Sequence, residues 1–337
     1  MKSYFCTLFD SYYLSRGLTM YRSLAATGAD FHLYIFAFDD RCEKILKQLS
    51  LPAVTVVSLR EFEDEELLSV KPLRSRAEYC WTCSSSTILY CLQRFGLPHC
   101  TYIDADLYFY RDPVVLLEEM GDHSVLITEH RYSPQYEKAV KAGIYCVQFI
   151  TFKNDAYGLK TLQWWRDRCI EWCYARQEEG KFGDQKYLDD WPERFKNVWV
   201  LQHLGGGLAA WNIQQYDVRE GPEGLVCTER KTGHTFLPVF YHFHYLRFLT
   251  DGRIELGRRQ LSEAVKACFY QPYLKELEES KRRIQTLDNT FDPHGAAPPP
   301  SGLKPALVSL LRKLKGVYHI YYLDDFVKQY ADHGPYH

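Results

Sequence analysis

The sequence predicts an α/β protein with a mostly parallel central sheet that is flanked by helices. Short apolar runs of strand length alternate with segments of helical periodicity from near the N-terminus onward, a pattern typical of such sheets. Several apolar runs end in acidic residues, which would place carboxylates at the sheet edge where ligands bind. Hydrophobic residues form 46% of the 337 positions, enough for a large core. We expect one large α/β unit followed by a helical C-terminal extension.

Charge and targeting signals narrow the class of protein. The net charge is −2, so no basic excess exists to bind nucleic acid. The N-terminal apolar run is too short for a signal peptide, and no stretch approaches the roughly 18 apolar residues of a membrane span. The cysteines number 11, and without an export signal they predict reduced thiols in a cytoplasmic protein. Cys80 and Cys83 have Cys-x-x-Cys spacing without a second pair, so we expect no metal or redox site there.

The first half of the chain is predicted as repeated strand–helix units. The expected strands are residues 3–9, 31–38, 54–57 and 100–103. The expected helices are residues 14–28, 40–49, a short acidic helix from Arg60 with a solvated face, and 76–95. No Gly-x-Gly-x-x-Gly or Walker-type loop follows the first strand, which excludes the usual dinucleotide and P-loop arrangements.

The second half continues the α/β pattern before its character changes. The expected strands are residues 125–128, 145–150 and a last core strand over 236–247. The expected helices are one opened by Asp112-Pro113, residues 155–177, a short helix opened by Gly183-Asp184, and residues 261–286. Proline suits a first helical position because the N–H there has no partner. Capping of a helix N-terminus is a complete structural explanation for Asp184.

Two carboxylates, Asp104 and Asp106, stand one residue apart where the strand at 100–103 ends. In an extended chain alternate side chains share a face, so both acids would point the same way. Like charges this close repel unless one is protonated or a cation lies between them. Magnesium and manganese prefer carboxylate oxygen. The pattern therefore favours a divalent metal site, and a solvated turn after a buried strand is the alternative.

Two further segments have both a functional and a structural interpretation. His242 and His244 share a face of the expected last strand, with Arg247 just beyond, which fits a metal and phosphate site or hydrogen-bonded structural histidines. The glycine-rich loop over 205–212 lets the backbone approach a ligand closely, or forms a tight loop.

The C-terminal region differs in composition from the rest of the chain. Residues 294–302 are rich in proline, glycine and alanine and predict a linker. Residues 303–315 are basic and amphipathic, with leucines largely on one face. Such a helix docks on its own protein or lies on an anionic membrane surface, and we favour docking.

Five features, taken in their order along the chain, resemble those of a known family. They are a strand-end Asp10, the Asp104-Ala-Asp106 motif, the Asp184-Gln185 pair, a glycine-rich loop ending at Asn212, and His242. They are similar to the retaining nucleotide-sugar glycosyltransferases of the GT-A fold, close to glycosyltransferase family eight. The resemblance covers residues 3 to about 248. It implies a glycosyltransferase domain over 1–257 and leaves the helical extension over 258–337 outside.

The resemblance implies transfer of a hexose or N-acetylhexosamine from a UDP-sugar to a glycan or glycolipid acceptor, with retention at the anomeric carbon. Asp104, Asp106 and His242 would hold Mn²⁺ or Mg²⁺, with imidazole favouring manganese, although His244 remains an alternative ligand. Asp184 and Gln185 would be catalytic and face the donor sugar, with Gln185 stabilising oxocarbenium-like charge. The implied nucleotide-sugar contacts are Thr7, Leu8, Asp10, Tyr13, Asp104, Asn212, His244 and Arg247.

The sequence departs from the family pattern in two places. The late motif usually continues from its histidine through glycine to Lys-Pro-Trp, whereas His242 is followed by Phe-His-Tyr-Leu-Arg247, so Arg247 is an inferred phosphate-binding cation. The helix before the paired acids lacks the family's arginine within Ser84-Ser85-Ser86, where Arg74 or Arg76 would substitute.

Three other classes compete with the glycosyltransferase. A catalytically inactive protein that binds nucleotide sugars or glycans would keep the same motifs. A haloacid-dehalogenase-type phosphatase would need its Asp-x-Asp in the first strand and a small hydroxyl residue where Tyr108 stands. A sugar nucleotidyltransferase would need a glycine-rich basic loop after the first strand, which residues 10–16 do not form. The transferred sugar and the acceptor are left open.

Overall fold

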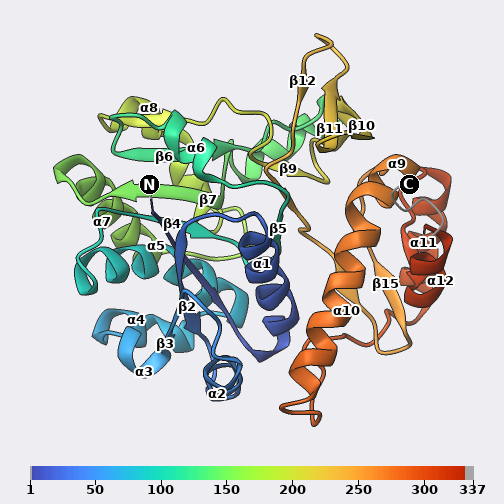
Figure 1. Cartoon of the computed structure of the whole chain (residues 1–337), viewed down its shortest axis with the longest axis horizontal. Helices are drawn as coiled ribbons and strands as arrows, with labels where there is room; N and C mark the ends of the chain where they lie inside the picture. The colour runs from blue at the N-terminus through green and yellow to red at the C-terminus, as the bar shows by residue number, and fades with distance from the viewer. Residues whose placement is uncertain (1, 331–337) are drawn as a thin grey trace.

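The computed structural model describes residues 2–330, and its centre is a seven-stranded sheet (Figure 1). The strand order is β3-β2-β1-β4-β7-β6-β8. The strands are β1 Ser3–Phe9, β2 Phe31–Ala37, β3 Val54–Ser58, β4 His99–Ile103, β6 Val125–Glu129, β7 Tyr145–Lys153 and β8 Val198–Val200. The first four neighbours run parallel, and so do β6 and β8, while β7 is antiparallel to both its neighbours. The predicted mostly parallel sheet flanked by helices is confirmed.

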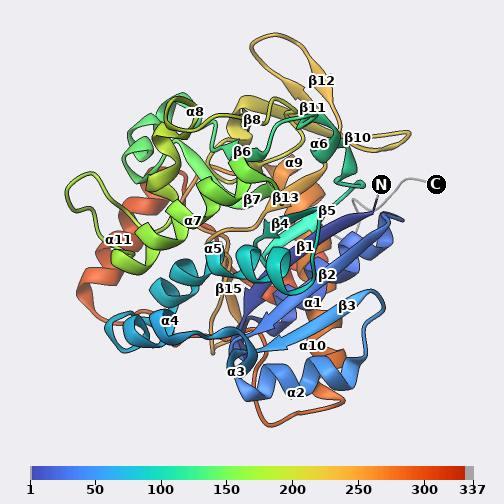
Figure 2. The same cartoon turned by 90° about the vertical axis from the view of Figure 1, so that its left-hand side faces the viewer.

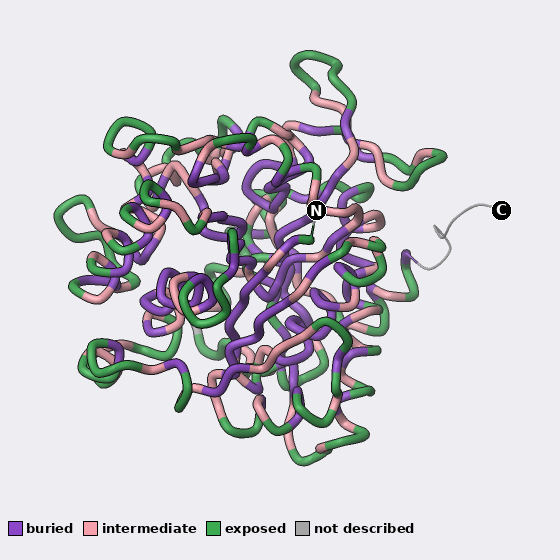
Figure 3. Tube along the Cα trace, turned by 60° about the vertical axis from the view of Figure 1, so that its left-hand side comes forward, coloured by how far each residue is buried: buried purple, intermediate pink, exposed green. Residues whose placement is uncertain are grey.

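Helices cover both faces of the sheet because its strands are apolar on both sides. In β1, Phe5 contributes to one core and its neighbour Cys6 to the other. Figure 2 shows α5 and α7 in front of the strands, with α1 behind them, and Figure 3 shows the central strands buried beneath exposed outer turns. The main helices are α1 Leu14–Ala26, α2 Asp40–Leu49, α5 Arg76–Arg94 and α7 Ala156–Glu171. Shorter helices are α3 Leu59–Phe62, α4 Glu65–Val70, α6 Val114–Glu119 and α8 Trp191–Arg194.

One helical prediction needs correction. The helix α7 ends at Glu171 rather than near residue 177, because Trp172 is extended and the chain then folds into a turn closed between Glu178 and Lys181. The acidic segment after Arg60 is largely exposed, as predicted, and its Asp64 and Glu66 each also lie 2.5 Å from the guanidinium of the buried Arg166. All eleven cysteines, including those of the Cys-x-x-Cys segment in α5, are free thiols.

The prediction of one last core strand over 236–247 is wrong. The segment is divided among β12 Thr235–Phe236, β13 Phe240–His242 and β14 Arg247–Phe248. Pro238 interrupts it, since proline lacks the N–H that a ladder needs, and Tyr245 turns the chain with a φ of 75°. The strand β13 joins β5 Leu107–Phe109 and β9 Leu208–Ala209 in a separate three-stranded sheet. The hairpin of β10 Tyr216–Gly221 and β11 Gly224–Glu229 pairs with β12 and projects from the body (Figure 1).

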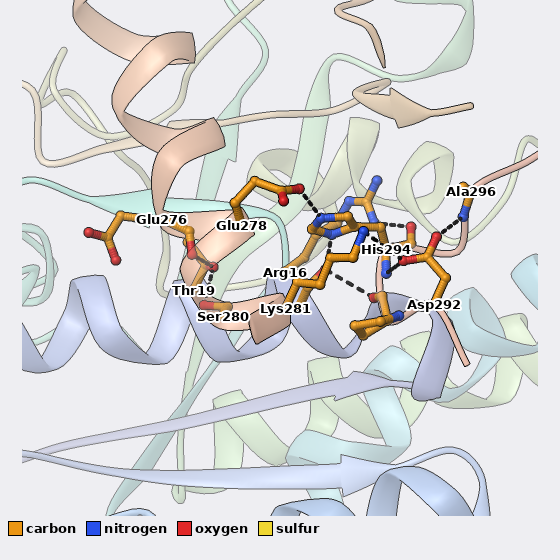
Figure 4. A network of polar contacts seen from close by, with 11 residues as sticks. Arg16, Thr19, Glu276, Glu278, Ser280, Lys281, Asp292, His294 and Ala296 are labelled. Atoms are coloured by element: carbon orange, nitrogen blue, oxygen red, sulfur yellow. Dashed lines mark hydrogen bonds and ion pairs between the residues drawn. The ribbon is translucent and has the colours of Figure 1, made fainter. Parts of the chain in front are cut away.

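The C-terminal region is attached to the α/β unit by a polar network (Figure 4). The predicted helix over 261–286 is confirmed as α9 Glu263–Val265, a π-helical turn and α10 Gln271–Gln285. The Thr19 hydroxyl of α1 lies 2.7 Å from the Ser280 hydroxyl of α10. The segment predicted as a linker begins at a buried His294, whose ring nitrogens lie 2.8 Å from the Ser15 hydroxyl and 2.7 Å from a Glu278 oxygen. This end of the segment is therefore fixed to α1 and α10.

The C-terminal region also contains β15 Arg253–Glu255, α11 Leu303–Leu314, β16 Ile320–Tyr322 and α12 Leu323–Gln329. The helix α11 contacts the protein as expected, but not through its leucine face: Leu307, Leu310 and Leu314 are 59%, 54% and 76% exposed. The opposite side of the helix docks instead, because Arg312 is buried with Nη1 2.6 Å from Glu255 Oε1. No helix within residues 2–330 combines the length and apolar character that crossing a bilayer requires.

Candidate functional site

The two acids of the Asp-Ala-Asp motif converge on one histidine. The strand β4 ends at Ile103 and the chain turns at Asp104, so the extended geometry expected for the motif is wrong. The turn nevertheless brings both carboxylates to His242: its Nε2 lies 3.0 Å from Asp106 Oδ1 and 3.6 Å from Asp104 Oδ2. The reason is tertiary, since β5, which follows the turn, pairs with β13, which carries His242.

A buried glutamine orients this histidine. His242 Nδ1 lies 2.6 Å from Gln148 Oε1 of β7, and an amide oxygen only accepts hydrogen bonds, so Nδ1 carries a proton. The Nε2 atom is thereby directed at the two acids. In metal sites, a hydrogen bond from one ring nitrogen of a histidine leaves the other nitrogen to bind the metal. Sequence reasoning missed Gln148, and the available signal was a fully buried polar residue within the apolar run of β7.

Burial and charge set the protonation of this cluster. Burial chiefly raises the pKa of Asp104 to about 6. Burial also acts on Asp106, but the charge of His242 and its hydrogen bond outweigh it and hold the Asp106 pKa below its usual value. Although burial opposes charge on His242, the Asp106 carboxylate raises the pKa of this imidazole well above its usual value. The proton on Nε2 therefore offsets the negative charge of the paired acids.

The side chains around this cluster fit a divalent metal. One ligand atom from each of Asp106, His242 and His244 lies within 4.8 Å of the others. Asp104 is close to this group because its Oδ2 lies 3.6 Å from His242 Nε2. Two carboxylates with imidazole nitrogen suit manganese. The Tyr13 hydroxyl donates to Asp106 Oδ2 at 2.7 Å, so this tyrosine supports the acid cluster rather than standing free to stack on a base. His244 comes close through a turn after β13, not through strand alternation.

The acids border a cavity of about 350 Å³, within the range of roughly 300–1,000 Å³ typical of small-molecule sites. Asp104, Asp184, Gln185, His242 and His244 all line it. Aromatic residues that sequence reasoning did not single out for the site also line it: Trp81, Tyr132, Phe182 and Tyr245. Polar groups and aromatic faces together suit a sugar-bearing ligand.

The predicted catalytic pair lies at the cavity wall. Asp184 precedes the 3-10 turn Gln185–Asp190 but makes no capping hydrogen bond, so capping does not explain this residue. Burial, assisted by the nearby Asp104 charge, raises the pKa of Asp184 to about 7. The backbone of this loop is fixed because the buried Trp165 donates from Nε1 to the Asp184 carbonyl at 3.0 Å. Gln185 Nε2 donates to the Ala142 carbonyl at 2.9 Å.

The predicted nucleoside contacts lie at the end of β1. Thr7 and Leu8 are buried within the strand. Asp10 accepts the Tyr12 backbone N–H at 2.9 Å and pairs with Arg76 Nε at 2.5 Å. Arg76, one of the two suggested substitute arginines, is therefore paired with this acid. Tyr12 is 49% exposed, with the Arg76 guanidinium 5.1 Å from the centre of its ring. Tyr12 therefore offers an accessible aromatic ring beside Asp10.

The glycine-rich loop packs against protein. A Cβ on Gly205 would lie 2.3 Å from the Leu237 carbonyl oxygen, and one on Gly206 would lie 2.6 Å from a Leu201 methyl. Asn212, predicted to contact the nucleotide sugar, is buried and donates from Nδ2 to the His130 and Gly207 carbonyls at 2.9 and 2.8 Å. The tight-loop interpretation therefore holds, and the Asn212 amide stabilises that loop.

The predicted phosphate-binding cation does not itself line the cavity but lies beside a residue that does. Arg247 is exposed in β14, with its guanidinium 5.7 Å from the centre of the Tyr245 ring. Arg258 and Arg259 line the cavity instead. Both follow β15 Arg253–Glu255 and stand just past the end predicted for the glycosyltransferase domain. Nothing in their local sequence indicated a role.

Comparison with solved structures identifies the fold class as GT-A. The galactosyltransferase LgtC in complex with donor and acceptor sugar analogs has a similar fold, with a TM-score of 0.53 at 10% identity over 82% of this chain and 95% of that one. An active-site mutant of LgtC matches with a TM-score of 0.51 at 12% identity, with the same coverage of both chains. These likenesses establish the GT-A fold.

Two sequence relatives place the chain within a family. The uncharacterized protein YfnD of Bacillus subtilis (strain 168) is 30% identical over 294 residues, covering 86% of this chain and 92% of that protein. The uncharacterized protein YfnF of the same organism is 31% identical over 303 residues, covering 87% and 97%. The chain belongs to the family of YfnD and YfnF. No family model matches it.

Proposed function

We propose that this protein is a metal-dependent glycosyltransferase. It moves a hexose or N-acetylhexosamine from a UDP-sugar to a glycan or glycolipid acceptor, with retention at the anomeric carbon. One observation carries the proposal: Asp104, Asp106 and His242 converge beside a cavity that also contains Asp184 and Gln185. On a GT-A fold, this pairing of a divalent metal site with a sugar-sized cavity fits nucleotide-sugar chemistry best.

The roles follow from the geometry of the side chains. A bound Mn²⁺ or Mg²⁺ would act as a Lewis acid toward the diphosphate leaving group. Asp104, Asp106 and His242 would hold it, while Gln148 keeps Nε2 directed at the site. The Nε2 of Gln185 is occupied by the Ala142 carbonyl, which leaves its Oε1 to stabilise oxocarbenium-like charge.

Calorimetric titration of UDP with and without Mn²⁺ tests the proposal. We expect Mn²⁺ to strengthen UDP binding at least about tenfold, because a metal held by the two acids would offset the negative charge of the diphosphate. Asp104→Asn should abolish that gain, whereas Asp122→Asn, at an exposed residue, should keep it. Equal UDP affinity with and without metal would refute the proposal. Metal-dependent binding without hydrolysis of any UDP-glucose, UDP-galactose or N-acetyl donor would instead favour an inactive nucleotide-sugar-binding protein.

We also propose that α11 contacts an anionic membrane surface, the inner face of the cytoplasmic membrane. Its leucine face is exposed while Arg312 on the other side is buried against the body. Residues 303–315 contain Lys304, Lys313 and Lys315 and no acidic residue, so charge complements anionic headgroups. This placement would bring the active site close to a lipid-linked acceptor.

Vesicle co-sedimentation tests this contact. The protein should bind phosphatidylglycerol vesicles more strongly than phosphatidylcholine vesicles, and binding should weaken with salt. Leu307→Glu with Leu314→Glu should abolish binding, whereas Leu68→Glu, at an exposed leucine of α4, should not. Failure to bind either vesicle, or a concentration-dependent dimer that the double variant abolishes, would refute membrane contact.

A further inference from the structure

One wall of the cavity is formed by the segment that follows β15. Gly257, Arg258 and Arg259 line it. Among the described residues around the cavity, these two arginines alone carry a permanent positive charge, whereas Asp104 and Asp184 contribute carboxylates. The permanent positive charge of this site therefore comes from a segment outside the motifs that resemble a known family.

The two guanidinium groups remain free to bind an anion. The Arg258 side chain is 63% exposed, and its Nε lies 3.9 Å from Glu255 Oε1, so this ion pair is loose. The Arg259 guanidinium stacks 4.1 Å from the centre of the Tyr136 ring, and no ion pair within residues 2–330 neutralises it. A stacked guanidinium keeps its donor edge available for phosphate oxygens.

The C-terminal extension holds this wall in place. The buried Arg312 of α11 reaches Glu255 Oε1 at 2.6 Å from Nη1 and the Gly257 carbonyl at 2.7 Å from Nη2. His319 Nε2 donates to the Arg259 carbonyl at 2.8 Å. The strand β16, which follows His319, pairs with β15. Contacts from beyond residue 300 thus bracket the arginine segment on both sides.

We propose that Arg258 and Arg259 bind the diphosphate of the nucleotide sugar, and that Arg312 is a positioning residue for them. This inference rests on the proposed function and adds two cations that line the cavity. A divalent metal neutralises the two acids that hold it, so the diphosphate requires further positive charge. Guanidinium groups supply that charge with charge-assisted hydrogen bonds. The extension thereby completes the donor site.

Titration of UDP and UMP in the presence of Mn²⁺ tests the arginine pair. Arg258→Ala with Arg259→Ala should weaken UDP binding about 50-fold or more and UMP binding much less, because each charge-assisted hydrogen bond contributes roughly tenfold. The matched variant Arg60→Ala, at an exposed arginine of α3, should stay within about twofold of wild type. Wild-type protein that does not bind UDP would refute the proposed function. Wild-type binding that the double variant retains, or that Arg60→Ala loses equally, would refute the arginine assignment alone.

A second comparison isolates the positioning role of Arg312. Arg312→Met should lower the preference for UDP over UMP about tenfold, and Arg312→Lys should restore part of it through the retained charge. Mn²⁺ binding, measured by the electron paramagnetic resonance signal of free manganese, should be unchanged. A variant that melts at a lower temperature but keeps the wild-type preference for UDP over UMP would refute the positioning role.

Discussion

Asp106→Asn is expected to lower Mn²⁺-dependent turnover of the UDP-sugar by about 1,000-fold or more. Asp106 is buried, lies 3.0 Å from His242 Nε2 and accepts the Tyr13 hydroxyl. If the protein has the proposed function, removing this charge would weaken the proposed metal site and the stabilisation of the leaving diphosphate. Losing one such group typically costs two to three orders of magnitude or more. Release of UDP from the donor sugar, measured with a coupled assay across Mn²⁺ concentrations, gives the effect.

Two comparisons make this result specific to the metal site. Asp122→Asn carries the same chemical change at an exposed position and should retain wild-type turnover. Manganese binding to Asp106→Asn should weaken in parallel with turnover, since both depend on the same carboxylate. Turnover within about threefold of wild type at saturating donor and limiting Mn²⁺ would show that Asp106 does not hold the metal.

Trp165→Ala is expected to lower the free energy of unfolding by about 3–5 kcal/mol, the usual cost of emptying a large aromatic site in a core. The Trp165 side chain is fully buried, and its ring lies 6.1 Å from that of Phe152 and 5.7 Å from that of Trp191. Denaturant unfolding followed by circular dichroism measures the loss. The half-buried neighbour Trp164, on the same helix, serves as the matched control, and Trp164→Ala should cost clearly less.

Trp165→Phe separates packing from the link to the site. It keeps most of the buried ring but removes the hydrogen bond to the Asp184 carbonyl, so stability should fall by only about 1–2 kcal/mol. The Asp184-Gln185 loop should become less ordered. Turnover should therefore fall by more than the small loss of folding free energy can explain. Full turnover in Trp165→Phe would show that this hydrogen bond does not position the loop.

The predictable part of this structure is local. Strands and helices near the predicted bounds follow from apolar periodicity within single segments, as for β1 and α1. The prediction failed where a long-range pairing overrode the local pattern: Pro238 and the turn at Tyr245 divide the expected last strand, and β13 pairs with β5 instead of the main sheet.

The candidate site also has a part that the local sequence predicts and a part that depends on long-range contacts. The motif of Asp104 and Asp106 is visible in sequence because both acids adjoin one strand end. Arg258 and Arg259 were not visible, because their position depends on Arg312, which lies more than fifty residues further along the chain. The outward-facing leucines of α11 were misjudged for a related reason: an amphipathic pattern identifies two faces but does not say which one meets the protein.

The amino-acid order alone therefore specified the α/β architecture, the acids at a strand end and the residue types for metal chemistry. The folded chain determined how these parts meet. Gln148 and His242 are 94 residues apart and Tyr13 and Asp106 are 93 apart, yet each pair shares a hydrogen bond. Such contacts depend on sheet pairing and core packing across the whole chain, so the periodicity of single segments does not predict them.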